Sequence, residues 1–266
     1  MKHLRFILAL ISFCVIFVLI AFPQLLILSL VYQILNRSES YRRERIAYWT
    51  VQWGDLSFRV ICRLMKISAH FNLPDPMTTP AIMIANHQST FDAPLITTIF
   101  KRVGFMNPRW VVKKEIFDVF AIGWMSRTTG CIPVSRSKDP KDLERLAVGA
   151  VDVYRDRAPI FLFPEGKRFT QVVPGSGLKH LLPPKRGGFT ALTSILPTYP
   201  VLSVMIKWNG PTQAIETRKL FQLTNLVGTH LTVEGRLIPA EVVAADPDWL
   251  IHEWERIDAA LAEPTN

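Results

Sequence analysis

The amino-acid sequence predicts an α/β fold, with a mainly parallel sheet flanked by helices and an N-terminal membrane-embedded helix or helical hairpin. Short apolar runs alternate with segments whose apolar residues recur at helical spacing, a pattern typical of parallel sheets. Polar residues follow several of these runs, as they do at the ligand sites of such sheets. Residues 4–35 are almost continuously apolar, which indicates a membrane segment.

The composition limits the possible partners. The chain has 266 residues, enough for one large domain or for one domain with an anchor. Its net charge of +9 points to an anionic partner, such as lipid headgroups, a phosphorylated substrate or nucleic acid. Its three cysteines are widely spaced and form no CxxC pair. This favours a reducing, cytoplasm-facing compartment, and no metal centre is expected.

The N-terminal apolar segment, residues 1–36, is assigned to an anchor and leaves two alternatives open. At about 1.5 Å per residue, one straight helix would exceed the roughly 30 Å of a bilayer core. A single transmembrane helix would therefore be tilted, with an interfacial end. Alternatively, the segment breaks near Pro23 and forms a hairpin in one leaflet. Basic residues on both sides fit a hairpin with both ends cytoplasmic, namely Lys2, Arg5, Arg37, Arg42, Arg43 and Arg45.

Residues 37–72 are predicted to form an amphipathic linker helix. Apolar residues recur every three or four positions over residues 40–67, which gives the helix one apolar face. That face carries Trp49 and Trp53, which either lie at a membrane interface or pack on the domain core. The turn-rich stretch 73–80 then separates this helix from a globular domain, which we expect over residues 73–266.

Strands and helices are expected to alternate in the globular domain. The last helix is expected to begin with Asp246 as its N-cap and Pro247 in its first turn. A loop rich in Pro, Gly and basic residues is expected over residues 171–188. The expected strands cover residues 81–85, 109–114, 130–136, 159–163, 199–206 and 230–237, and the expected helices cover residues 89–99, 116–124, 142–154, 189–196 and 247–261.

The stretch 81–95 contains the main candidate site. An apolar strand ends at Asn86 and His87, and a helix is expected from Ser89 with Asp92 in its first turn. One interpretation is a His–Asp pair, in which the imidazole takes a proton from a hydroxyl and the carboxylate orients the ring. The other is that Asp92 only caps the helix and His87 is an ordinary turn residue. On the spacing alone, the cap is favoured.

Charged residues at other strand ends are candidates to lie near His87. The carboxyl ends of parallel strands meet at one edge of a sheet, where ligands bind. Guanidinium groups at that edge suit a phosphate, because they give two parallel hydrogen bonds to its oxygens. Each candidate could instead be a solvated side chain. They are Lys113, Lys114, Arg136, Glu165, Lys167 and Arg168, with Lys179, Lys185 and Arg186 in the loop that follows.

Four blocks of residues occur in order behind the apolar segment. They are Asn86-His87-x4-Asp92, Gly130-x5-Arg136, Phe163-Pro164-Glu165-Gly166-x-Arg168 and Leu196-Pro-Thr-Tyr-Pro200-Val201. Together they resemble the glycerolipid acyltransferases, which include the 1-acylglycerol-3-phosphate acyltransferases. The resemblance covers residues 81–204. Lys167 departs from the family pattern, which usually has Thr or Ser at that position.

A finer similarity lies in the stretch after the third block. It reads Arg168-Phe-Thr170 and then Leu178-Lys-His-Leu-Leu-Pro-Pro-Lys-Arg-Gly-Gly-Phe189. This stretch is similar to the branch that contains the lysocardiolipin and lysophosphatidylinositol acyltransferases and several lysophosphatidate acyltransferases.

The resemblance implies a glycerol-3-phosphate acyltransferase-like fold and an O-acyltransferase activity. A fatty acyl group would pass from acyl-CoA or acyl-ACP to the free sn-2 hydroxyl of a lysophospholipid, in the first instance 1-acyl-glycerol-3-phosphate, giving phosphatidate. His87 would be the general base and Asp92 would orient it. The acyl thioester is a co-substrate, and no cofactor is expected. The acceptor site would comprise Lys113, Lys114, Arg136, Glu165, Gly166 and Arg168, with possible lipid or donor contacts from Lys167, Lys179, Lys185 and Arg186.

The expected location is a membrane, the inner membrane if the source is bacterial, with the acyltransferase domain on its cytoplasmic face. An anionic membrane surface would then explain the positive charge, which disfavours a nucleic-acid partner. An alternative function is that of a membrane-anchored, non-catalytic lipid-binding or scaffold protein on the same fold. The intact His87, Asp92 and Arg168 disfavour it. The chain has no Gly-x-Ser-x-Gly motif, which counts against a serine hydrolase.

Overall fold

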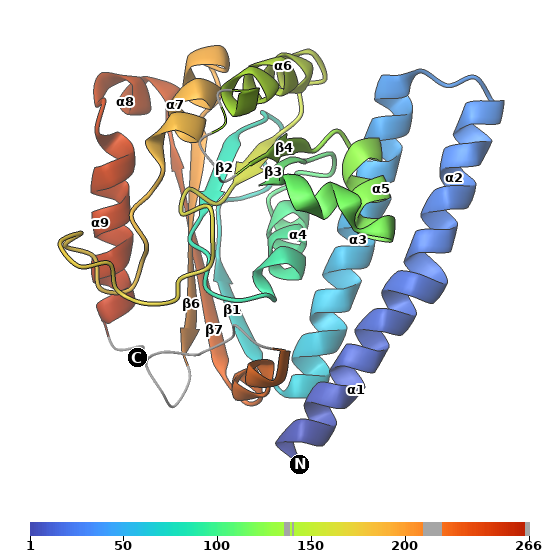
Figure 1. The fold of residues 1–266 in the computed structure, drawn as a ribbon, viewed down its shortest axis with the longest axis horizontal. Helices are drawn as coiled ribbons and strands as arrows, with labels where there is room; N and C mark the ends of the chain where they lie inside the picture. Colours follow the sequence, from blue (N-terminus) through green and yellow to red (C-terminus); the bar gives the residue numbers. More distant parts are fainter. Residues whose placement is uncertain (136–138, 140, 210–219, 264–266) are drawn as a thin grey trace.

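A seven-stranded sheet forms the centre of the protein, in the order β1-β7-β6-β2-β5-β3-β4 (Figure 1). The computed structural model describes residues 1–135, 139, 141–209 and 220–263. Every pair of neighbouring strands is parallel except β6–β7, which confirms the predicted α/β fold with a mainly parallel sheet. The strands are β1 (Ser68–Asn72), β2 (Ile82–Ala85), β3 (Arg109–Lys113), β4 (Ile132–Val134), β5 (Ile160–Leu162), β6 (Val201–Asn209) and β7 (His230–Ile238).

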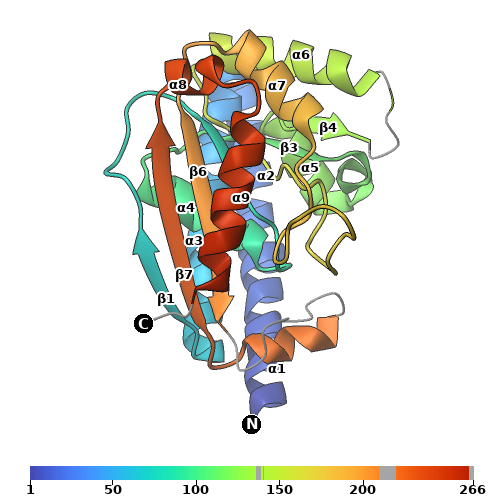
Figure 2. The ribbon, with the colours of Figure 1, turned by 90° about the vertical axis from the view of Figure 1, so that its left-hand side faces the viewer.

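Helices cover both faces of the sheet, so the central strand β2 is buried on both sides. Met83 joins a core formed with α3 (Glu39–Met65) and α4 (Asp92–Arg102). Ile82 and Ile84 join a second core on the opposite face. That core includes α6 (Lys141–Arg155), α7 (Arg186–Ile195) and α9 (Trp249–Ala262), which lie together in Figure 2. A strand between two helical layers is expected to be apolar throughout, as β2 is.

The N-terminal apolar segment is one uninterrupted helix of 33 residues, Lys2–Ile34. It consists of α1 (Lys2–Cys14), π-helical turns over Val15–Ala21 and α2 (Phe22–Ile34). Pro23 lies inside this helix, directly after the π-helical turns, and does not break it. The alternative of a hairpin broken near Pro23 is therefore wrong, because the chain reverses only after α2, where α3 returns beside it (Figure 1).

This helix has an apolar face that no described residue covers. Phe6, Phe22 and Leu25 are buried, whereas Leu19 and Ile27 are 68% and 62% exposed. The mean hydropathy of its most apolar stretch is 2.9, and by length and composition the helix could cross a membrane. A contiguous apolar surface of this length is unfavourable in water, so it suggests that the protein associates with a membrane.

Helix α3 is packed on two sides. The buried residues Val51, Phe58 and Ile61 face the sheet core, while Trp49 and Trp53 of the predicted stripe are half-buried. Trp53 Nε1 donates to Gln24 Oε1 of α2 at 2.6 Å. The sequence therefore predicted only one of two packed faces, because α3 lies between the N-terminal helix and α4.

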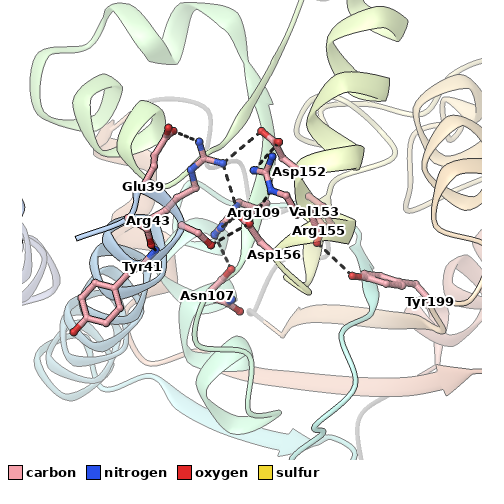
Figure 3. Close-up of polar contacts among 12 residues, drawn as sticks. Glu39, Tyr41, Arg43, Asn107, Arg109, Asp152, Val153, Arg155, Asp156 and Tyr199 are labelled. Atoms are coloured by element: carbon pink, nitrogen blue, oxygen red, sulfur yellow. Dashed lines mark hydrogen bonds and ion pairs between the residues drawn. The ribbon is translucent and has the colours of Figure 1, made fainter. Parts of the chain in front are cut away.

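A buried ion-pair cluster ties α3 to α6 and to the start of β3 (Figure 3). Asp156 lies 3.0 Å from Arg109 and 3.7 Å from Arg43, and its side chain is 3% exposed. Burial opposes ionisation of Asp156, but hydrogen bonds from Arg109 and Ser40 outweigh it and lower its pKa. Asp152, which is more exposed, pairs with Arg43 at 3.4 Å. Arg43, one of the basic residues that follow the apolar segment, thus belongs to a buried ion-pair cluster.

Several local expectations were wrong. Strand β1 lies inside the predicted linker helix and pairs with β7. The predicted helix over 116–124 is a 3₁₀ segment, Lys114–Asp118, followed by α5 (Phe120–Thr128), and α8 (Ala240–Ala245) was not predicted. Asp248, not Asp246, is the N-cap of α9. Asp246 instead accepts the backbone N–H of Asp248 and contacts His252. The division at residues 36/37 and 72/73 stays a prediction.

Replacement of Asp156 by alanine is expected to destabilise the fold by about 3–5 kcal/mol, because it leaves buried guanidinium groups without their shared carboxylate. The matched variant Asp152→Ala removes a more exposed carboxylate and should cost about 1 kcal/mol or less. Thermal unfolding in detergent, followed by circular dichroism, measures both. Equal losses in the two variants would contradict a buried cluster at Asp156.

Candidate active site

The candidate site is built on the turn that links β2 to α4. Asn86 follows β2, and its side chain is fully buried. Its Oδ1 accepts the backbone N–H of Ile206 at 2.7 Å, and its Nδ2 donates to the carbonyl of the same residue at 2.9 Å. This two-bond clamp fixes the end of β2 against the neighbouring strand β6, and so fixes where His87 leaves the sheet.

His87 and Asp92 form a hydrogen-bonded pair. His87 Nδ1 lies 2.9 Å from Asp92 Oδ2, and the ring stacks on Phe163 with centroids 4.0 Å apart. Because an ionised carboxylate can only accept, Nδ1 carries the hydrogen. The other ring nitrogen, Nε2, is then left with a lone pair that can take a proton. The imidazole is partly exposed, at 19%, whereas the Asp92 side chain is fully buried.

Asp92 does not cap its own helix. The N-cap of α4 is Phe91, and no side chain bonds there. Asp92 Oδ2 instead reaches back to accept the backbone N–H groups of Gln88 and Ser89 at 2.7 and 2.8 Å. The cap explanation that the spacing favoured is therefore wrong, because the carboxylate closes the turn that precedes the helix and contacts His87 from within it.

The segment after β5 is bonded to the same turn. Glu165 Oε1 accepts the backbone N–H of His87 at 2.8 Å, and Phe169 donates its N–H to the carbonyl of His87 at 2.7 Å. Arg168 donates to Thr90 Oγ1. Blocks that lie 78 residues apart in the sequence are thus joined through backbone contacts, and they place a guanidinium beside the turn that carries His87.

Glu165 is a buried carboxyl group with both oxygens engaged. Its residue is 1% exposed, and Oε2 accepts the backbone N–H of Leu182 at 3.1 Å. Burial raises the pKa of Glu165 to about 8, although the N–H groups of His87 and Leu182 act in the opposite direction. Glu165 therefore holds the turn and the following loop together. Its assignment to the acceptor site stays a prediction.

Gly166 and Lys185 lie against each other beside Glu165. Gly166 has φ +69°, a left-handed conformation that strains any other residue. A Cβ at this position would lie 3.2 Å from Lys185 Nζ. Lys185 also donates its backbone N–H to the carbonyl of Pro164 at 2.8 Å. The ammonium group of this loop lysine is thereby brought to the segment that carries Arg168.

The other predicted residues are spread around the site. Lys113 ends β3, two strands from β2, and pairs with Glu115 at 2.9 Å. Lys114, Lys167 and Lys179 are exposed. Arg186 contacts Asp248 and the carbonyl of Pro247 at the start of α9, and is thus engaged away from the turn. Arg136 lies outside the described residues. Among the described residues, no three His, Cys, Asp or Glu side chains gather to hold a metal ion.

A cavity of about 550 Å³ lies between α2 and α5. Aromatic and aliphatic side chains form most of its wall, and Phe120 at its rim is 81% exposed. Its lining includes Phe22 and Leu26 from the N-terminal helix and Phe117, Phe120 and Trp124 from the segment after β3. Asp118 and Arg127 complete the lining, so the space beside the apolar helix is mostly, but not wholly, apolar.

Comparison with known proteins assigns the segment that contains these residues to a family. The sequence profile of the acyltransferase family matches residues 66–207, a segment that includes His87, Asp92, Glu165 and Arg168. The chain belongs to the acyltransferase family. The matched segment contains the strands from β1 to most of β6, and all of the predicted site residues lie within its bounds.

Curated relatives in the acyltransferase family are similar over part of their length. The chain is 28% identical over 152 residues to a chloroplastic 1-acyl-sn-glycerol-3-phosphate acyltransferase of Arabidopsis thaliana, covering 57% of this chain and 38% of that protein. It is 33% identical over 127 residues to the 1-acyl-sn-glycerol-3-phosphate acyltransferase of Saccharomyces cerevisiae, covering 46% and 38%. The aligned region thus spans well under half the length of these relatives.

A solved structure has the same fold. The 1-acyl-sn-glycerophosphate acyltransferase PlsC from Thermotoga maritima matches with a TM-score of 0.63 and 17% identity, and the match covers 100% of both chains. At this identity the likeness establishes the fold alone. It extends over the N-terminal helix as well as the acyltransferase domain.

Sequence reasoning missed two contacts of the site. Trp208 Nε1 donates to Asp92 Oδ1 at 3.0 Å, and the predicted strand ended at residue 206, before this side chain. The Asn86 clamp on Ile206 was missed as well, although Asn86 lies in the first block. The order of strands would have been needed to find them, because β6 adjoins β2 only in the folded sheet.

The raised pKa of Glu165 predicts a pH dependence of stability. Between about pH 4.3, the pKa of an unfolded Glu, and about pH 8, the folded protein holds a proton that the unfolded chain has released. Stability should therefore fall as the pH rises through this range. In Glu165→Gln, which cannot ionise, the unfolding temperature measured from pH 5 to 9 should decline less steeply. A slope equal to that of the wild type would contradict the assignment.

Proposed function

We propose that the protein is a 1-acyl-glycerol-3-phosphate O-acyltransferase, which transfers a fatty acyl group from an acyl thioester to the sn-2 hydroxyl of lysophosphatidate and forms phosphatidate. The arrangement that carries this proposal is the His87–Asp92 pair with Arg168 bonded to the same turn. It combines a proton acceptor with a phosphate-binding group at the carboxyl edge of the sheet. The acyltransferase profile and the two relatives support the same reaction.

In the proposed mechanism, His87 acts as the general base. Its Nε2 takes the proton of the acceptor hydroxyl as the oxygen attacks the thioester carbonyl, while Asp92 holds Nδ1–H and stabilises the imidazolium. The new C–O ester bond forms, the C–S bond breaks, and the proton passes to the departing thiolate. A thioester is already activated, so no acyl-enzyme is needed. Phe163 stacks on the imidazole and restricts its rotation.

The acceptor phosphate is proposed to bind to cations around the turn. Arg168 lies at the turn itself, and Lys185 lies against Gly166 in the same segment. Lys113, Lys114 and Arg136 are proposed as further phosphate ligands, because β3 and β4 end at the same edge of the sheet. Glu165 contributes by fixing the backbone of His87.

The acyl chain and the membrane complete the proposed substrate path. The cavity between α2 and α5 is lined mostly by apolar residues, with Asp118 and Arg127 also in its wall, and it adjoins the N-terminal helix, so we propose that it receives an acyl chain from the bilayer. The site would then lie on the cytoplasmic face, with acyl-CoA or acyl-ACP as donor. The stretch from Arg168 to Phe189 supports a place near the lysocardiolipin and lysophosphatidylinositol acyltransferase branch, which a screen of lysolipid headgroups tests.

His87→Ala is expected to lower turnover by about 10²–10⁴-fold, since it removes the general base. Asp92→Ala should cost a similar factor, and the double variant should cost little more, because the two side chains act as one unit. The assay uses purified protein, lysophosphatidate and labelled acyl-CoA or acyl-ACP. Absence of turnover by the wild type with any lysolipid and either donor would favour a non-catalytic lipid-binding protein.

Arg168→Ala is expected to raise the KM for lysophosphatidate by about tenfold or more, because a charge-assisted hydrogen bond to phosphate is lost. The KM for the thioester should change little. Arg102→Ala is the matched control, since Arg102 stacks on Phe71 at the other end of α4. An equal effect of both substitutions on the acceptor KM would argue against a phosphate contact at Arg168.

A further inference from the structure

Consecutive residues at the carboxyl end of β6 contact the rest of the fold, and two of them contact the turn between β2 and α4 that carries His87. The backbone of Ile206 is held by Asn86. Lys207 Nζ donates to the carbonyl of Ala260 at 3.1 Å and to that of Glu263 at 2.5 Å, which fixes the strand to the end of α9. Trp208 then projects into the core shared with α4. The two residues directly before Trp208 are thus anchored, one to Asn86 and the other to the end of α9, which fixes the strand from which the indole projects.

The indole contacts the carboxylate oxygen that the rest of the turn leaves unused. Asp92 Oδ2 contacts His87 Nδ1 and the N–H groups of Gln88 and Ser89. Asp92 Oδ1 accepts from Trp208 Nε1 at 3.0 Å. Asp92 is fully buried and Trp208 is 8% exposed, so water has little access to this bond.

We propose that Trp208 is a positioning residue for the reaction, which acts by holding the carboxylate plane of Asp92 and through it the ring of His87. This inference rests on the proposed function. The terminal torsion of an Asp side chain is broad and roughly two-fold, so bonds to Oδ2 alone leave the plane free to turn. A donor on Oδ1 fixes the plane, because both oxygens are then anchored. Trp208 lies one residue beyond the segment that the family profile matches.

The buried position of Trp208 indicates that the site depends on its N–H group more than on its apolar ring. A ring that only filled the core could be replaced by another apolar side chain of similar volume at modest cost. A lost N–H, in contrast, leaves a buried carboxylate oxygen without its donor, which is unfavourable. Asp92 can then recover a partner only by turning, and this moves Oδ2 away from His87 Nδ1.

The kinetic test replaces the N–H group and little else. Trp208 is exchanged for 3-benzothienylalanine, in which sulfur takes the place of N–H, and Trp208→Phe is made in parallel. We expect the analogue to lower kcat by about 10- to 100-fold, as a misplaced catalytic group does. The KM values for lysophosphatidate and for the thioester should stay within about twofold. The same analogue at Trp53, whose N–H also donates to a side-chain oxygen, that of Gln24, should leave kcat unchanged.

A second measurement does not depend on turnover. The side-chain nitrogens of ¹⁵N-labelled histidine report which ring nitrogen of His87 carries the hydrogen, and the His87 signals are assigned by their loss in His87→Ala. The analogue at position 208 should shift the His87 signals, because the acceptor of Nδ1–H has moved. The analogue at position 53 should not shift them.

The outcomes distinguish a failure of the proposed role of Trp208 from a failure of the proposed function. A kcat within about twofold of wild type, a loss confined to KM, or unchanged His87 signals in the analogue would each overturn the role of Trp208. A loss of activity in Trp208→Phe that the analogue does not share would also overturn it, since that pattern indicates packing alone. If the wild type shows no turnover, the proposed function fails, and the His87 signals alone decide whether Trp208 positions the pair.

Discussion

The site depends on the hydrogen bonds made by the buried carboxylate of Asp92. A buried charge is unfavourable unless hydrogen bonds satisfy it, and Asp92 meets this requirement with donors from its own turn and from β6. The bonds that satisfy the charge also define the turn. The contacts that satisfy the buried charge therefore also orient the ring of His87, so the proposed general base would need no further support.

The two edges of the sheet use charge differently. At the amino end of β3, Arg109 and Asp156 form a buried, closed pair that ties α6 to the sheet. At the carboxyl end of β2, His87 and Arg168 are instead partly exposed, and Arg168 is bonded to Thr90 of the same turn. Under the proposed function, stability and substrate contact would therefore depend on different charged groups. Part of the positive charge of the chain thus lies in buried ion pairs, such as that of Arg109 with Asp156.

The sequence predicted most of the sheet but only part of the site. Apolar runs such as residues 81–85 are strong signals for buried strands, so the order of strands and helices from β2 to β6 followed from the pattern. Strand β1 was missed because its residues, Ser68–Asn72, alternate between exposed and half-buried positions. The contacts of Glu165 with backbone N–H groups and the contact of Asp92 with the Trp208 indole could not be predicted from the sequence. They depend on which strands become neighbours, and no local spacing encodes that choice.

The sequence separations within the site have a consequence for biosynthesis. The contacts Asn86–Ile206 and Asp92–Trp208 join residues 120 and 116 positions apart. At a synthesis rate of about 5–20 residues per second, the ribosome makes β6 roughly 6–24 s after the turn that it completes. The apolar helix is made before β6, so a nascent chain can reach the membrane while its turn still lacks these partners. The site is therefore assembled only after β6 has been made.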